Sequence, residues 1–181
     1  MPVAPPRSTL HYGEQDMAET AFDDPDLNTI ADKLAIHFRE GGTIGDLHGF
    51  DEKDYEAMYA VGHGLYTQGR HRDAAKVFGF LMTNNPYDRR FPLAMGATQQ
   101  MLGKHAEAAG FYGLAVVLDM TDPVPLFHMA ECMAALGQID EAREAFQHAQ
   151  EFATKPEHQP IREKAAVQLK LLEQSATKRE G

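Results

Sequence analysis

The chain repeats itself every 34 residues between Tyr55 and Pro156, and this periodicity constrains the fold more than any other feature. Four classes of residue keep the same step through three consecutive copies, with no insertion between them. The recurring positions are the glycines Gly69, Gly103 and Gly137, the small residues Gly62, Gly96 and Ala130, the alanines Ala74, Ala108 and Ala142, and the aromatic residues Phe78, Tyr112 and Phe146.

A period of this length with small residues at fixed offsets is typical of tetratricopeptide repeats, in which each copy folds into two antiparallel helices, A and B. The small residues allow the paired helices to approach, the aromatic residue fills the space between neighbouring pairs, and the glycine ends helix A in a left-handed conformation. Because no pair can bury its apolar face alone, the copies must stack. We therefore predict an all-α fold with three tandem hairpins in a short superhelix, at residues 55–88, 89–122 and 123–156.

The flanking segments predict a tail, an amphipathic helix with a connector, and a C-terminal capping helix. The expected helix is opened by Asp24-Pro25 and stopped by Gly41-Gly42, whereas the preceding stretch has no sustained period and is rich in proline. The predicted segments are a flexible tail at residues 1–22, the first helix and connector at 23–50, the repeats with their caps at 51–156, and the capping helix and tail at 157–181.

The first predicted helix has one apolar face that needs a surface to cover it. Four of its residues recur at helical spacing, namely Leu27, Ile30, Leu34 and Phe38. Packing on the first repeat is one interpretation, and packing on a second copy of the protein is the other. In the second case these four side chains form a dimer interface.

Composition limits the partners. The net charge of −10 is concentrated in residues 1–54, which hold 12 acidic and 4 basic residues, whereas residues 55–181 hold 15 and 13. No basic stripe is available for a phosphate backbone, so we expect neither nucleic acid nor an anionic membrane surface as a partner. Met1 to Leu10 lacks the apolar core of a secretory signal, and the single Cys132 fits a buried structural thiol in a reducing cytosol.

Motifs of catalysis are missing from the sequence. The nine histidines do not recur at metal-ligand spacing, and there is no glycine-rich phosphate loop or nucleophile elbow. We expect a protein that is not an enzyme, with no catalytic residue, metal or cofactor.

The inner side of a tetratricopeptide stack usually holds a peptide, and it is lined by fixed positions of the A helices. In this chain those positions are mostly aromatic and aliphatic, and they lack the Lys, Asn and Arg clamp of co-chaperones that bind acidic tails. Tyrosine suits such a groove, since it buries a large area and keeps a polar tip. The predicted groove residues are Tyr59, His63, Tyr66, Leu93, Ala97, Gln100, Phe127 and Glu131.

Three stretches of this chain are similar to one family. These are Gly41-Gly42-Thr43-Ile44, Tyr87-Asp88-Arg89-Arg90-Phe91 and Phe127-His128-Met129-Ala130-Glu131-Cys132. Over about residues 25–155 the chain resembles the class II chaperones of bacterial type III secretion, the LcrH/CesD/SycD-like group.

The resemblance implies a dimeric cytosolic protein that binds an N-terminal segment of hydrophobic translocator proteins in its groove before export, without a stable membrane association. It places Tyr59 and Tyr66 at peptide-contacting positions, whereas His63 stands where an aromatic hydrocarbon side chain is common. The alternative is a general tetratricopeptide scaffold that assembles other soluble proteins.

Overall fold

The computed structural model describes residues 25–180, and the chain divides into two compact units after Thr43. In the first unit, helix α2 spans Pro25–Arg39, and Gly41 follows it with a φ of 88°. The glycine therefore stops this helix where the sequence predicted. The expected flexible tail at residues 1–22 and the expected cap Asp24 lie outside the described residues.

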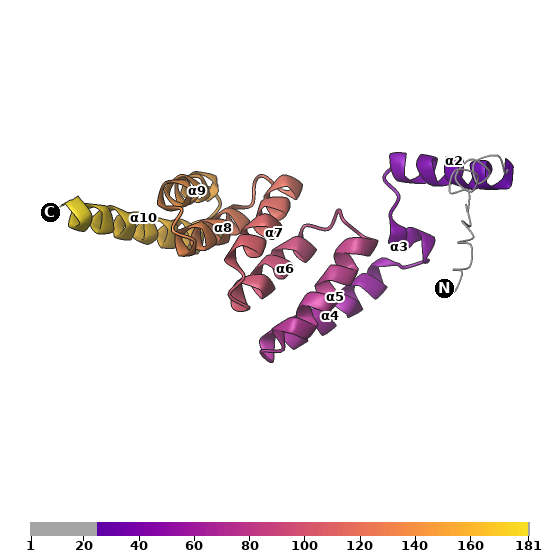
Figure 1. The fold of residues 1–181 in the computed structure, drawn as a ribbon, viewed down its shortest axis with the longest axis horizontal. Coiled ribbons are helices and arrows are strands. Elements are labelled where there is room, and N and C mark those ends of the chain that lie inside the picture. Colours follow the sequence, from indigo (N-terminus) through magenta and orange to yellow (C-terminus); the bar gives the residue numbers. More distant parts are fainter. Residues whose placement is uncertain (1–24, 181) are drawn as a thin grey trace, which may run out of the picture. The chain divides into compact units, whose positions relative to one another are not determined.

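The second unit is a row of helical hairpins, and the predicted all-α tetratricopeptide architecture is confirmed (Figure 1). Each hairpin packs against the next, and the last helix packs against α9. After the short α3 (Ile44–Leu47), the helices are α4 (Glu52–Thr67), α5 (His71–Asn84), α6 (Arg90–Met101), α7 (His105–Leu118), α8 (Pro123–Ala135), α9 (Ile139–Phe152), the 3₁₀ turn η1 (Pro156–His158) and α10 (Gln159–Glu180).

The three A helices α4, α6 and α8 end in the same way. Gly69, Gly103 and Gly137 have φ angles of 76°, 74° and 79°, which side chains with a Cβ rarely adopt. Beyond Gly69 the N–H of Arg70 donates to the carbonyl of Leu65 at 2.9 Å, and equivalent bonds close the other two helices. Glycine is thus required for the reversal from helix A to helix B.

Helices A and B of one repeat approach so closely that a side chain on helix A would collide with the aromatic residue on helix B. A Cβ added at Gly62 would lie 2.7 Å from the ring of Phe78, and one added at Gly96 would lie 2.8 Å from the ring of Tyr112. Both rings are about 1% exposed. The aromatic residues of the repeat therefore occupy the space that the glycines leave open.

The connector before the first repeat packs on that repeat and belongs to the same compact unit. Residues 44–47 form α3, and a Cβ at Gly45 would overlap the hydroxyl of Tyr55. His48 is hydrogen bonded through Nδ1 to Oδ1 of Asn84 at 3.0 Å, and Phe50 packs against Tyr55. A helix of one turn has no period that a sequence could reveal, so only these contacts show where it belongs.

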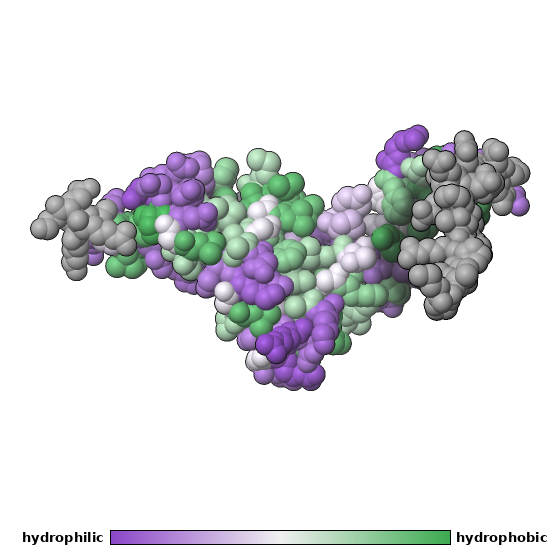
Figure 2. All heavy atoms as spheres, viewed as in Figure 1, coloured by the Kyte–Doolittle hydropathy of each residue, from purple (hydrophilic) through white to green (hydrophobic). Residues whose placement is uncertain are grey.

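Some apolar surface remains exposed on the repeat unit. In α7 and the turn that follows it, Leu114 is 40%, Val117 74% and Met120 67% exposed. Figure 2 shows hydrophobic residues on the surface of this part of the unit, and hydrophilic ones at the turn between α4 and α5. Helix α7 is thus apolar on its outer side as well as in the core.

We expect Gly96→Ala to lower the free energy of unfolding by about 2 kcal/mol, because the added methyl group must displace the ring of Tyr112. Denaturant unfolding measures this change. The matched control is Gly110→Ala in α7, where nothing lies within 4 Å of the added Cβ, and we expect this change to stabilise the helix by about 0.5 kcal/mol. Equal effects of the two substitutions would contradict the close-packing argument.

Candidate peptide-binding groove

A mostly apolar hollow of about 230 Å³ crosses the three A helices. Residues of α4, α6 and α8 form its sides, and one aromatic residue each from α5 and α7 completes the lining. The lining consists of Tyr59, His63, Tyr66, Phe78, Leu93, Ala94, Ala97, Tyr112, Val124 and His128. We refer to it below as the first hollow.

Five of the eight residues predicted for the groove line this hollow, and a sixth and seventh are bonded to its lining. The five are Tyr59, His63, Tyr66, Leu93 and Ala97. Gln100 accepts a hydrogen bond from the hydroxyl of Tyr112, and Glu131 is bonded to the ring of His128.

Phe127 is the exception among the predicted groove residues. Its side chain is only 3% exposed and packs against Phe146, with ring centroids 5.5 Å apart. The structure therefore places it in the core between α8 and α9, because the start of α8 is covered on that side by α9.

Phe78 and Tyr112 were interpreted from the sequence as packing residues alone, yet they also line the hollow. The two rings pack against the glycine of the preceding A helix, Gly62 and Gly96 respectively, and so extend between the A helices. The repeat pattern could have indicated this. An aromatic residue of helix B that faces a glycine of helix A can extend past that glycine to the groove side of the helix pair.

Arg90 supports the Tyr59 side of the hollow. Its guanidinium lies 5.3 Å from the centroid of the Tyr59 ring and forms ion pairs with Asp88 and Glu56, both at 2.6 Å. Burial opposes ionisation of Asp88, but the hydrogen bonds and charge of Arg90 outweigh it and lower the pKa of this carboxyl. The arginine thus lies beside the groove, and its positive charge is already balanced by two carboxylates.

A chain of hydrogen bonds runs beneath the other side of the hollow. Tyr112 donates to Oε1 of Gln100 at 2.7 Å, Gln100 Nε2 donates to Glu131 Oε2 at 3.4 Å, and His128 Nδ1 lies 2.8 Å from the same oxygen. Burial raises the pKa of Tyr112 well above its usual range, so its hydroxyl stays protonated. Burial also opposes ionisation of Glu131, but the interactions with His128, the hydrogen bond from Gln100 and the charge of Lys164 together outweigh it and lower that pKa.

Cys132 lies behind this network and is fully buried. Burial raises the pKa of its thiol to about 11, which keeps it protonated and unreactive at neutral pH. The expectation of a buried structural thiol is confirmed.

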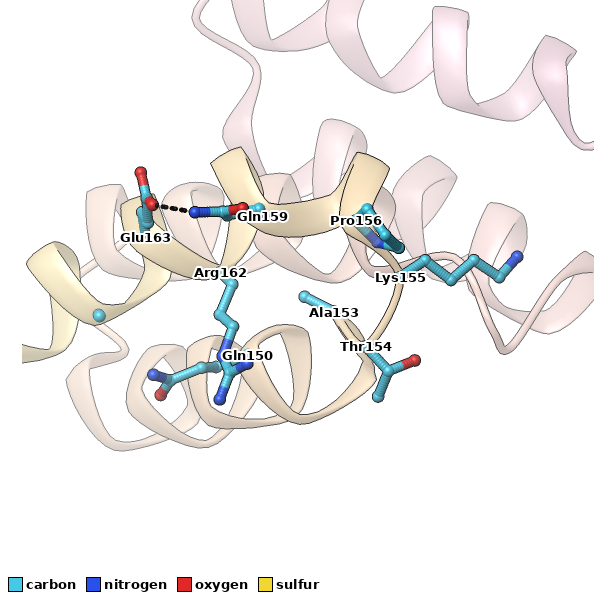
Figure 3. Close-up of a pocket in the computed structure, with 9 residues that line it drawn as sticks. Gln150, Ala153, Thr154, Lys155, Pro156, Gln159, Arg162 and Glu163 are labelled. Carbon is cyan, nitrogen blue, oxygen red and sulfur yellow. Dashed lines mark hydrogen bonds between the residues drawn. The ribbon is translucent and has the colours of Figure 1, made fainter.

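A larger hollow of about 510 Å³ lies between α9 and α10 and is polar (Figure 3). Arg162 of α10 points toward Gln150 of α9, and Glu163 accepts a hydrogen bond from Gln159 Nε2 at 2.9 Å. Charged, amide and hydroxyl side chains make up most of this lining, so it is a poorer match to an apolar peptide than the first hollow.

Residues 25–180 contain neither a membrane-spanning helix nor a cluster of metal ligands. No helix there has the length and apolar content needed to cross a membrane. No three metal-binding side chains in that range come together as a ligand set.

Comparison with known proteins identifies the family of this chain. The family model for tetratricopeptide repeats matches residues 94–122. The Low calcium response locus protein H of Yersinia pseudotuberculosis is 33% identical over 133 residues, covering 73% of this chain and 79% of that protein. The chain belongs to the LcrH/SycD family of type III translocator chaperones.

Solved structures of the family have the same fold. A type III secretion complex from Aeromonas hydrophila is 30% identical, covers 80% of this chain and 97% of its own, and superposes with a TM-score of 0.77. Yersinia enterocolitica SycD in complex with a peptide of the translocator YopD is 31% identical, with coverages of 70% and 97% and a TM-score of 0.67. SycD has also been solved as an alternative dimer.

We expect Asp88→Asn to lower the free energy of unfolding by about 1 kcal/mol at neutral pH, because the ion pair with Arg90 is lost while an oxygen remains to accept the N–H of Arg90. Since the folded-state pKa of Asp88 is lowered, its contribution is complete above the unfolded pKa near 3.9 and is lost as the pH falls through the folded value. The difference from wild type should therefore shrink in acid.

Denaturant unfolding over a pH series tests this. The control is Asp140→Asn, since the Asp140 side chain is 87% exposed and pairs with Arg143 on one turn of α9. A difference that persists unchanged in acid for Asp88→Asn would rule out the charge as its cause.

Proposed function

We propose that this protein is a cytosolic bacterial chaperone that binds an extended segment of a hydrophobic translocator in the first hollow and keeps that client soluble before export. The observation that carries the proposal is a hollow lined by all three A helices, apolar in its walls and with its charges neutralised, in a chain of the LcrH/SycD family. The complex of SycD with a YopD peptide supports it by relationship.

The physical basis is mass action. A translocator must later enter a membrane, so it carries apolar stretches that aggregate or insert early when they are free. A chaperone that binds one segment lowers the concentration of the free form in proportion to its affinity. A hollow of this size with a few aromatic anchors gives a reversible complex, which export requires.

Catalysis has no part in this mechanism. Holding and release depend on burial of client side chains against Tyr59, Tyr66 and Leu93, and no bond of the client changes. The polar tips of the two tyrosines can accept or donate a hydrogen bond to an extended backbone while their rings bury apolar area.

Co-expression tests the proposal directly. A translocator that precipitates when produced alone should remain in the soluble fraction together with this chain, and the two should elute together from a sizing column. A translocator that precipitates equally with and without the chain would overturn the chaperone role.

We expect Tyr59→Ala or Tyr66→Ala to weaken client binding by about 2 kcal/mol, or roughly 30-fold, because each removes an aromatic anchor of the hollow. Calorimetric titration with a translocator peptide measures the affinity. The matched control is Tyr87→Ala, since Tyr87 is 57% exposed and lies outside the lining. The groove assignment is wrong if all three variants bind as the wild type does while remaining folded.

We also propose that α2 forms a dimer interface through its apolar face, in keeping with the dimer known for SycD. Leu27, Ile30, Leu34 and Phe38 are 49%, 52%, 38% and 44% exposed, and all four recur on one side of the helix. Such a stripe is typical of a helix that buries this side against another surface.

We expect Leu34→Asp to raise the dimer dissociation constant by at least about tenfold, because it would bury a carboxylate in the interface. Sedimentation equilibrium measures the constant. Ile36→Asp is the control on the opposite side of α2, where Ile36 is 48% exposed. A monomeric wild type, or equal effects of the two substitutions, would exclude this interface.

A further inference from the structure

Another hollow, of about 540 Å³, lies between α8 and α10 and shares a lining residue with the first hollow. We refer to it below as the second hollow. His128 of α8 is the residue that lines both hollows. The helix expected only to cap the stack therefore stands in the place of a fourth A helix. The two hollows are therefore neighbours along the row of helices, on either side of one residue of α8.

The second hollow differs from the first in its chemistry. Pro160 and Val167 of α10 give it apolar surface, and the side chain of Val167 is largely exposed, as the 58% exposure of the residue indicates. Glu131 and Glu163 supply two carboxylates, whereas Lys164 supplies one ammonium. An apolar wall beside an excess of negative charge suits a side chain with an aliphatic stem and a cationic end.

The carboxylates keep capacity for such a group. Glu131 uses Oε2 for both His128 and Gln100, and the part of the chain that the structure describes offers no hydrogen bond to its Oε1. Glu163 accepts one bond from Gln159 through Oε1. Each carboxylate can accept more than one donor, so both keep acceptor capacity for a guanidinium or ammonium beside the existing bonds.

We propose that the client segment bound in the first hollow continues past His128 into the second hollow, where a lysine or arginine of the same client packs its stem on Pro160 and Val167 and directs its charge to Glu131 and Glu163. The inference rests on the function proposed above and adds a specificity to it. The first hollow selects apolar side chains, and the second selects a basic residue at a fixed distance from them.

Selection of peptides from a random phage-displayed library on the full-length chain tests this. Peptides that also bind the Tyr59→Ala variant are first removed from the library. We expect the selected peptides to carry apolar anchors and, at a constant offset, lysine or arginine. Replacing that lysine by norleucine should weaken binding to the wild type about fivefold, and this loss should diminish at high salt.

Charge variants of the protein locate the effect. With Glu163→Gln the norleucine and lysine peptides should bind with similar affinity, and with Glu163→Lys the selection should yield aspartate or glutamate at the same offset. Glu144→Lys makes the same charge change on an exposed residue of α9 outside both linings, and it should leave the preference for lysine intact. Circular dichroism confirms that each variant is folded.

The outcomes separate the two proposals. The second site is wrong if the peptides selected on the wild type depend on Tyr59 but carry no basic residue at a constant offset. It is also wrong if selection on Glu163→Lys yields the same basic residue. Either result leaves the first site intact. Failure to select any peptide that depends on Tyr59 would overturn both.

Discussion

The close approach of the two helices within each repeat determines the depth of the groove. At Gly62 and Gly96 the ring of the facing aromatic residue takes the position that a Cβ would need. Phe78 and Tyr112 consequently reach between the A helices and form part of the hollow's lining. Folding and binding thus depend on the same contacts, and a larger residue at either glycine would disturb the binding surface together with the core.

The polar groups around the groove are compatible with an apolar ligand because the protein pairs them itself. Arg90 is held by Asp88 and Glu56 at one side, and Tyr112, Gln100, Glu131 and His128 satisfy one another beneath the other. An unpaired charge at either place would have to be desolvated when a client binds, at a cost of several kcal/mol. The paired arrangement avoids this cost and fixes the orientation of the rings that the client meets.

The sequence was sufficient for the fold and for the A-helix face of the groove, because both follow from a strict period. A 34-residue step locates the left-handed glycines and places Tyr59, Tyr66 and Leu93 on one side of the stack. It could not reveal α3, which is too short to show a period, or the burial of Phe127, which depends on how α9 covers α8. The hydrogen bond from Gln100 to Glu131 was also beyond prediction, since it joins two repeats through side chains whose rotamers the sequence does not specify.

Recognition in the first hollow must therefore rest on shape and apolar area rather than on charge. Its tyrosines, leucine and alanines present apolar surface, and the ionic groups around it are already paired within the protein. A chaperone that discriminated by this surface alone would bind most apolar segments of similar size, since one methylene changes affinity by about 1 kcal/mol. Discrimination between clients then requires groups outside the hollow, and the carboxylates of Glu131 and Glu163 in the neighbouring hollow are the groups that we propose for it.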